Sequence, residues 1–434
     1  MISRLLLLGA AGDLAGRFLL PSLAWLEAAG ALPADLQVVA AGAQDGDDAG
    51  FRASVAARWD TAAPDLPAAA RAAALARLRY RRFDADDPAS VAAAAGAFTG
   101  TGPVAAYLAL PPALFPATLR GLGSAGLPPG SRVAVEKPFG ADLAGAVALN
   151  GLLAEVSRGD ERAVTRVDHF LAMPAVTGLL DRRAAGELGP AEDGRTVAGV
   201  EVVWQETLGL EGRADFYDRT GAVRDVLQNH LLQVLVALAL EPPAAAADLP
   251  AARSAVLRSL RLASADPAAC TRRARYTAGT LADGTAVPDY ADEEGVAPAR
   301  CTETHAEVVL ALDVPRWAGT RFGVRTGKAV GTARKGVAVR FRDADRDPLW
   351  ISLEPAAQGP GADGAPGELA AYRAVLTDVL TGGSATSVGA EEAELAWRVV
   401  DPALKGWAAG AVPLLENRAG SAGPPPLDPG APRG

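Results

Sequence analysis

A polar segment opens one of the most apolar runs in the chain. The segment is GAVRDVLQNHLLQ, residues 221–233, and the residues VLVALAL that follow it predict a core helix. Its polar members are Arg224, Asp225, Gln228, Asn229 and His230. A buried polar group without a partner costs about 1–3 kcal/mol, so core packing gives no reason for five of them. A site is the simplest explanation, because histidine can accept a proton near neutral pH.

Histidine is otherwise scarce, since only His169, His230 and His305 occur in 434 residues. His169 lies in RVDHF (166–170), where Asp168 precedes it at the end of a predicted strand. Taken singly, Asp168 and His169 could be solvated polar residues, and His230 a core histidine bonded to a carbonyl group. Together they supply the general base and the orienting acid of a proton-transfer site. We therefore expect Asp168 and His230 to meet in space.

Two further motifs lie at predicted strand ends. The N-terminal LLLLGAAGDLA predicts a strand, a glycine turn and a helix whose backbone N–H groups can hold a pyrophosphate. Its spacing, G-x-x-G-x-x-A, is by itself weak evidence for a nucleotide-binding site. The stronger evidence is its place in the first strand–helix turn. The second motif, EKPFG, puts Lys137 at a strand end, either as a surface charge before a turn or, with a fixed Lys–Pro bond, as a ligand contact. The cofactor-binding candidates in the glycine turn are Gly9, Gly12, Asp13 and Leu14.

The elements that must position these motifs change character near residue 174. Residues 1–174 alternate strands with helices, which predicts a Rossmann-like, doubly wound parallel sheet. Residues 175–417 carry period-2 segments and predict an α+β domain with a large, mainly antiparallel sheet covered by helices. Residues 418–434 are too poor in apolar side chains to fold and predict a disordered tail. The predicted strands are 5–8, 36–43, 104–110, 132–138, 165–170, 200–206, 307–314, 336–342 and 349–355; the predicted helices are 13–29, 51–59, 68–78, 223–240, 250–260, 368–380 and 390–407.

Composition narrows the class of protein. The net charge is -9 and charges of both signs are interspersed, which disfavours nucleic-acid or membrane-surface partners. Cys270 and Cys301 lack metal-ligand spacing, so we expect no metal and a reducing, cytoplasmic compartment. The N-terminal apolar run is too short for a signal peptide, and no stretch approaches the ~20 residues needed to span a bilayer.

Eight segments resemble, in order, the signature segments of glucose-6-phosphate dehydrogenases. They are GAAGDLAGRFLLPSL, YLALPPALF, EKPFGADLAGAVALN, RVDHFLA, EGRADFYDRTGAVRDVLQNHLLQ, ALEPP, RTGKAV and DPALKGW. The resemblance implies that family's two-domain fold, NAD(P)-dependent oxidation of a sugar C1 hydroxyl to a lactone, and assembly as a homodimer or homotetramer.

The resemblance also implies a role for each matching residue. His230 would take the C1 hydroxyl proton, Asp168 would orient that histidine, and Lys137 would contact sugar and nicotinamide. The other implied contacts are His169 to phosphate, Glu206 and Asp225 to sugar hydroxyls, Lys328 to substrate, and Pro111 of YLALPP to cofactor.

The chain departs from the family where a 6-phosphate would be held. Phe170 and Met173 stand where the family has a tyrosine and a lysine, Phe18 stands where a lysine is usual, and Glu354 replaces a glutamine. Each lost charge-assisted contact costs about 1.5–3 kcal/mol. These departures predict a sugar that is unphosphorylated or altered at its 6-position, such as an amino sugar.

Two alternatives stay open. An ordinary glucose-6-phosphate dehydrogenase could hold the phosphate with His169, Arg334 and Lys335. A non-catalytic nucleotide-binding sensor is the other, although it would have no need of a complete set of catalytic groups.

The loop after the second predicted strand bears on the cofactor. It reads AGAQD, and no cation stands where the family has an arginine for the adenosine 2′-phosphate. Gln44 and Asp45 are better suited to a free ribose 2′-hydroxyl, because a carboxylate repels a phosphate. We therefore expect NAD to be favoured over NADP.

Overall fold

The computed structural model describes residues 1–186, 193–210, 212–241, 249–354 and 367–427. The chain divides into two compact units. Unit 1 comprises Met1–Pro174 and Gly359–Ala393, and unit 2 comprises Ala175–Gln358 and Glu394–Gly434.

Unit 1 contains a seven-stranded sheet in the order β16-β6-β5-β4-β1-β2-β3. All neighbours are parallel except β16, which runs antiparallel to β6. Strands such as β1 (RLLLL) are almost wholly buried, as expected when helices cover both faces. The predicted Rossmann-like sheet is therefore confirmed. The strands are β1 Arg4–Leu8, β2 Gln37–Gly42, β3 Leu78–Arg82, β4 Ala105–Leu108, β5 Arg132–Glu136, β6 Val164–Val167 and β16 Ser387–Val388.

Helices cover the two faces of this sheet with separate cores. One core is built on α1 and α12, and the other on α4, α5 and α6. Aspartates cap several helices; Asp142, for example, accepts a bond from the Gly145 N–H at the start of α6. The principal helices are η1 Ala15–Leu19 (a π-helix), α1 Leu20–Ala28, α2 Asp48–Ala62, α3 Ala68–Arg77, α4 Pro88–Ala95, α5 Phe115–Ala125, α6 Leu143–Val156 and α12 Gly367–Thr381.

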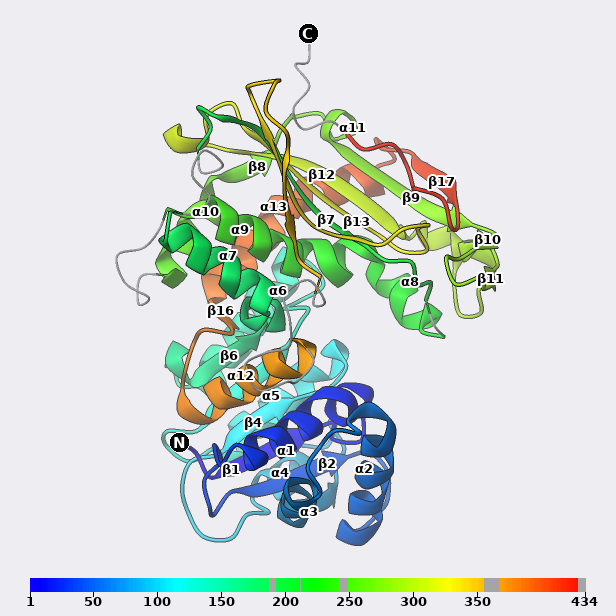
Figure 1. Cartoon of the computed structure of the whole chain (residues 1–434). Helices are drawn as coiled ribbons and strands as arrows, with labels where there is room; N and C mark the ends of the chain where they lie inside the picture. Colours follow the sequence, from blue (N-terminus) through cyan, green and yellow to red (C-terminus); the bar gives the residue numbers. More distant parts are fainter. Residues whose placement is uncertain (187–192, 211, 242–248, 355–366, 428–434) are drawn as a thin grey trace. The chain divides into compact units, whose positions relative to one another are not determined.

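Helix α12 corrects the predicted division of the chain. We expected residues 175–417 to form one continuous domain, but α12 and β16 belong to unit 1. Val375 and Leu376 of α12 are buried in the same core as Leu23 of α1, and α12, orange in Figure 1, lies along that helix. The apolar pattern of residues 368–380 predicts a helix correctly but does not reveal which sheet it covers.

Unit 2 is built on an eight-stranded sheet. Its order is β15-β14-β7-β13-β12-β9-β17, with β8 also paired to β12. Two pairs, β13 with β7 and β17 with β9, are parallel, and the others are antiparallel, which confirms the mainly antiparallel prediction. The strands are β7 Val197–Gln205, β8 Leu260–Leu262, β9 Thr271–Thr277, β12 His305–Leu312, β13 Arg321–Gly327, β14 Arg334–Phe341, β15 Leu349–Ser352 and β17 Leu414–Arg418.

Helices lie against one side of this sheet. The segment predicted as one helix over 223–240 is a π-helix, η6 (Val223–Leu231), continued by α9 (Leu232–Ala239), and both contact β13. Figure 1 shows α9 and α10 on the same side of the sheet. The other helices are α7 Pro174–Ala184, α8 Ala214–Ala222, α10 Leu249–Ser259, α11 Pro267–Cys270 and α13 Ala390–Ala408. No helix among the described residues is both long and apolar enough to cross a membrane.

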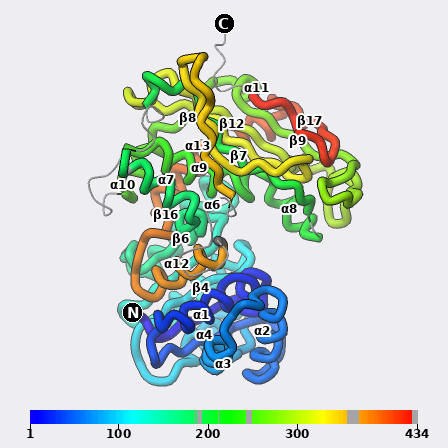
Figure 2. The backbone as a smooth tube through the Cα atoms, in the orientation of Figure 1, coloured from blue at the N-terminus to red at the C-terminus, as the bar shows by residue number. Residues whose placement is uncertain are grey.

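The C-terminal segment is ordered further than its composition predicts. Strand β17 runs beside β9 (Figure 2), and the chain after it stays bonded to unit 2. The Leu427 N–H donates to the Glu307 carboxylate at 2.8 Å, and the Gly331 N–H donates to the Ser421 carbonyl at 2.8 Å. The prediction of a loose tail from residue 418 is therefore wrong up to residue 427, because backbone hydrogen bonds and the burial of Ala419 and Leu427 hold the segment against unit 2. Residues 428–434 lie outside the described part of the chain.

Candidate active site

The glycine turn after β1 is built for close approach. Gly9 has a φ of 87°, and a Cβ added there would lie 2.2 Å from the Ala109 carbonyl oxygen, so only glycine fits. Gly12 donates its N–H to the Gly9 carbonyl at 2.9 Å, which tightens the turn. Both glycines line a pocket together with Gln44 and Pro111.

This pocket fits a dinucleotide. Its lining comes from residues that follow β1, β2, β3 and β4, which is the edge of a parallel sheet where such ligands bind. The side chains of Asp13 and Leu14, also predicted here, do not line it. Asp13 pairs with Arg17 at 3.3 Å in solvent, and Leu14 packs against the core. The backbone N–H groups of this turn are the groups that the prediction assigned to a pyrophosphate.

An arginine that the sequence pattern did not indicate lies beside the loop after β2. Strand β3 was not among the predicted elements, and its pairing sets Arg82 opposite Gly42 at the end of β2. The Arg82 Nε lies 3.2 Å from the Asp45 carboxylate. The loop itself contains no cation, as its sequence shows, but an arginine reaches Asp45 from the neighbouring strand.

The EKPFG motif lies at the end of β5, as expected. The Lys137–Pro138 peptide is cis. Glu136, which we had not singled out, is buried and accepts a hydrogen bond from the Tyr107 hydroxyl. Burial raises the pKa of Glu136 to about 7, although the bond from Tyr107 and the charge of Lys137 oppose this shift.

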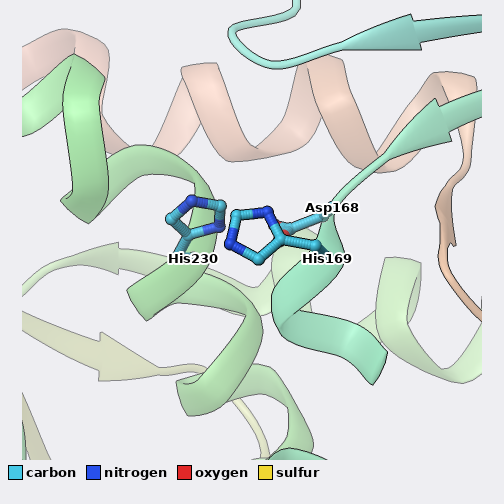
Figure 3. A group of neighbouring side chains, drawn as sticks. All are labelled: Asp168, His169 and His230. Atoms are coloured by element: carbon cyan, nitrogen blue, oxygen red, sulfur yellow. The ribbon is translucent and has the colours of Figure 1, made fainter. Parts of the chain in front are cut away.

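Asp168 and His169 lie where β6 ends (Figure 3). The Asp168 carboxylate accepts the Phe170 N–H at 3.0 Å and so caps the short helical turn η4, His169–Ala172. The His169 ring stacks on Tyr372 of α12, with centroids 5.0 Å apart, and its Nδ1 lies 3.3 Å from the Tyr372 hydroxyl. Tyr372 is a residue that the sequence pattern did not indicate, because it lies 203 positions from His169.

Apolar side chains lie near His169 at positions where the family resemblance implies phosphate-binding groups. Phe18 stacks on Tyr372 with centroids 5.2 Å apart, and we call Phe18, Tyr372 and His169 the aromatic row. Phe170 and Met173 are buried next to it in the chain. Burial raises the pKa of Tyr372 well above its usual value, and the carboxylates of Glu136, Glu368 and Asp168 raise it further. Carboxylates therefore lie near the Tyr372 end of the row, while the Arg17 guanidinium lies over the Phe18 ring, 5.2 Å from its centroid.

His230 lies on the π-helix η6 of unit 2 (Figure 3) and is buried. The start of this helix depends on Gly221, whose φ is 71° and where an added Cβ would lie 2.6 Å from a carboxylate oxygen of Glu303. That carboxylate accepts the Val223 N–H at 3.1 Å. The Asn229 side chain donates to the carbonyls of Arg224 and Asp225, at 2.9 and 3.2 Å. π-Turns of this kind are frequent at functional sites.

Glu303 is a second residue that sequence reasoning missed. It is buried, and burial raises its pKa while the bond from Val223 lowers it. It precedes β12 by two positions and lies 80 positions from Val223, so no local pattern could have linked it to the helix.

The predicted hydroxyl-binding groups of unit 2 come together. Strands β7 and β13 are parallel neighbours with Gln205 opposite Gly327, so the next residues, Glu206 and Lys328, emerge side by side. The Lys328 Nζ lies 2.7 Å from Glu206 and 3.8 Å from Asp225 of η6. We call these three side chains the charged triad. Lys328 also lies over the Tyr217 ring, 5.4 Å from its centroid.

Three residues predicted to lie near the substrate phosphate, Arg334, Lys335 and Glu354, lie near one end of β14. The Arg334 guanidinium lies over the Trp350 ring at 4.7 Å, and the Lys335 Nζ over Trp204 at 4.5 Å. Glu354 is partly buried, and its N–H donates to the Ser352 hydroxyl at 3.2 Å. Both cations are thus in contact with aromatic rings of unit 2.

Comparison with known proteins decides the family. Residues 6–177 match the model of the NAD binding domain of glucose-6-phosphate dehydrogenase, and residues 186–358 match the model of its C-terminal domain. Glucose-6-phosphate 1-dehydrogenase 2 of Mycobacterium tuberculosis is 37% identical over 71% of this chain and 68% of its own length. Glucose-6-phosphate 1-dehydrogenase of Zymomonas mobilis is 32% identical over 98% of this chain and 96% of its own. The chain belongs to the glucose-6-phosphate dehydrogenase family.

Solved structures agree with this family assignment. Glucose-6-phosphate 1-dehydrogenase from Mycobacterium avium has a TM-score of 0.81 at 27% identity, covering 98% of this chain and 96% of that one. A glucose-6-phosphate dehydrogenase in complex with its substrate glucose 6-phosphate shares the fold, with a TM-score of 0.81 at 24% identity over 97% of this chain and 95% of that one. As a member of the glucose-6-phosphate dehydrogenase family, the protein is an oxidoreductase that acts on a sugar CH–OH group with a nicotinamide cofactor.

Proposed function

We propose that the protein oxidises the C1 hydroxyl of a hexopyranose, with glucose 6-phosphate as the first substrate to test, and releases a lactone. The relatives named glucose-6-phosphate 1-dehydrogenase support this choice of substrate. The observation that carries the proposal is the charged triad, since an ammonium and a carboxylate at adjacent strand ends, with a second carboxylate from η6, suit the hydroxyl groups of a sugar.

His230 is proposed to accept the C1 hydroxyl proton as the C1–O bond becomes a carbonyl. Asp168 is proposed to orient the imidazole and to stabilise its positive charge after the transfer. The nicotinamide, when bound, accepts the hydride that leaves C1. Glu206 and Asp225 would accept hydrogen bonds from ring hydroxyls, Lys328 would donate one, and Lys137 would hold the sugar close to the cofactor. The roles of Asp168 and His230 follow from the family resemblance.

A second candidate substrate is a hexose that is unphosphorylated or carries an amine at its 6-position. The aromatic row favours this candidate, because Phe18 occupies a position where the family usually has a lysine and stacks on Tyr372. The acidic groups around Tyr372 would also repel a phosphate dianion and attract an ammonium group.

Steady-state kinetics distinguishes the two substrates. The purified protein is assayed with glucose 6-phosphate, glucose and a 6-amino-6-deoxyglucose, each with NAD and with NADP, by the absorbance of the reduced cofactor. A kcat/KM that is at least tenfold higher for glucose 6-phosphate establishes the first candidate, and the reverse order establishes the second. If no sugar produces reduced cofactor while a dinucleotide still binds, the protein is a sensor and the proposed function is wrong.

The cofactor is proposed to be NAD in preference to NADP. Gln44 and Asp45 lie beside the pocket that Gly9 and Gly12 line, and the Asp45 carboxylate suits a ribose 2′-hydroxyl. The nearby Arg82 makes NADP the alternative to test.

A further inference from the structure

We propose that Asp45 and Arg82 form an exchangeable ion pair that lets one pocket accept both nicotinamide dinucleotides. Asp45 would bind the adenosine ribose of NAD through its free 2′-hydroxyl, and Arg82 would leave Asp45 to bind the 2′-phosphate of NADP. This inference rests on the proposed function, because it requires a dinucleotide whose adenosine ribose lies at the end of β2.

The two side chains are placed by neighbouring strands. Strands β2 and β3 pair with Gly42 opposite Arg82, and the chain then turns through Gln44 to Asp45. Arg82 and Gln44 line the pocket that contains Gly9 and Gly12. Asp45 and Gln44 line a second pocket, and Gln44 therefore joins the two. A ligand that extends from the glycine turn past Gln44 would meet both members of the pair.

The backbone under the pair is fixed while the pair itself is free to rearrange. The Tyr80 hydroxyl donates to the Gln44 carbonyl at 2.7 Å, and the Tyr80 ring stacks on Phe51 at 4.9 Å. A Cβ on Gly42 would lie 2.8 Å from that hydroxyl, so glycine leaves room for the anchor. In contrast, the side chains of Arg82 and Asp45 are 64% and 95% exposed.

The energies favour exchange. An exposed ion pair contributes little to stability, whereas a phosphate dianion can accept charge-assisted hydrogen bonds from a guanidinium group in bidentate geometry. A 2′-phosphate therefore competes successfully with Asp45 for Arg82. With NAD the pair stays intact, and Asp45 can still accept a bond from the 2′-hydroxyl.

Two other arginines lie near the pair. Arg58 lines the pocket of Asp45 and donates to the Gly12 carbonyl at 3.2 Å, and Arg81 lies 3.6 Å from Asp48. Successive side chains of a strand point to opposite faces, so Arg81 and Arg82 point in different directions. Arg82 is the arginine that pairs with Asp45, and Arg81 is a matched control for the loss of one positive charge from β3.

Equilibrium binding tests the pair without turnover. Titration calorimetry with NAD and with NADP, in the absence of sugar, is carried out on the full-length wild type and on Arg82→Gln, Asp45→Asn and Arg81→Gln. We expect Arg82→Gln to weaken NADP about tenfold and to change NAD less than twofold. Asp45→Asn should tighten NADP about fivefold and weaken NAD, while Arg81→Gln should leave the ratio of the two dissociation constants unchanged.

Salt provides a second readout. Wild-type affinity for NADP should fall more steeply with sodium chloride than affinity for NAD, and Arg82→Gln should remove this difference. The inference is overturned if Arg82→Gln weakens both dinucleotides equally or neither, even though the proposed function would stand. If the wild type binds neither dinucleotide, both the inference and the proposed function are wrong.

Discussion

The charged triad of unit 2 and the aromatic row of unit 1 are both assigned to the sugar, but they differ in chemistry. In the triad, Lys328 lies between the carboxylates of Glu206 and Asp225, and adjacent strand ends fix its position. In the aromatic row, three rings stack, with carboxylates near Tyr372 and the Arg17 guanidinium over Phe18. The groups proposed for the sugar hydroxyls are thus charged and paired, whereas at the aromatic row a ring, Phe18, stands where the family resemblance implies a lysine. The two regions therefore test separately whether the protein carries out the reaction and whether it prefers a 6-phosphate.

The first test is whether His230 is the general base of the reaction. We expect His230→Asn to lower kcat by about 10²–10⁴-fold, the range for loss of a general base. NAD binding should be unchanged, because the cofactor pocket is formed by residues of unit 1. Stopped-flow or steady-state assays measure kcat, and calorimetry confirms cofactor binding. A variant that retains more than a tenth of wild-type kcat would exclude His230 as the base.

The second test removes the ammonium group of the charged triad. Lys328→Met leaves Glu206 and Asp225 without their ammonium partner, and we expect kcat/KM to fall about 10–100-fold, equivalent to one charge-assisted bond of about 1.5–3 kcal/mol. Lys405→Met is the matched control, since Lys405 is exposed and pairs with Asp401 on α13. Equal effects of the two substitutions would show that the triad does not bind substrate.

The burial of Glu136, whose carboxylate lies near Tyr372 of the aromatic row, predicts a pH-dependent stability. The Glu136 carboxyl titrates near 4.5 when unfolded and at about 7 when folded, so between these values the folded state keeps a proton that the unfolded state has lost. The free energy of unfolding should therefore fall as pH rises from 4.5 to 7. Glu136→Gln removes this contribution, and its stability relative to wild type should rise over that window by up to about 3 kcal/mol, at about 1.4 kcal/mol for each pKa unit.

Urea unfolding at several pH values between 4.5 and 8 measures this difference. Glu307, whose pKa burial also raises to about 7, is present in both proteins and cancels. A difference between wild type and Glu136→Gln that does not change with pH would contradict the assignment.

The aromatic row can also be converted back toward a phosphate site. Phe18→Lys places an ammonium near Tyr372 and His169, and we expect the ratio of kcat/KM for glucose 6-phosphate to that for glucose to rise about tenfold, as for one charge-assisted contact. Phe18→Leu controls for the loss of stacking. If both substitutions change the ratio equally, the missing lysine is not the reason for any weak phosphate binding.

The smallest effect is expected at Arg334. Its guanidinium lies over Trp350, which is itself exposed, so Arg334→Ala should change kcat/KM for glucose 6-phosphate by less than threefold. A loss of more than tenfold in the same kinetic assay would instead identify Arg334 as the cation that holds the phosphate. That result would make the aromatic row irrelevant to substrate choice.

Most of the fold was predictable because its signals are local. The run LLLLGAAGDLAG gives a strand, a turn and a helix from adjacent residues, and GAVRDVLQNHLLQ marks the helix that carries His230. The partners of these elements were not predictable. Tyr372, Glu303 and Arg82 reach their positions through a helix or strand pairing far along the chain, and no nearby pattern records such contacts. The charged triad was predicted as contacts, but its geometry depends on the parallel pairing of β7 with β13.

Helix α12 has a consequence for how the protein is made. Tyr372, Val375 and Leu376 pack in the core around α1, most of which residues 1–174 provide. Strand β16, which pairs with β6, also comes late in the chain, at residues 387–388. During synthesis, the part of this core that α12 covers therefore stays open until residues 367–381 have been made. Until then its apolar side chains are exposed to chaperones and to other nascent chains.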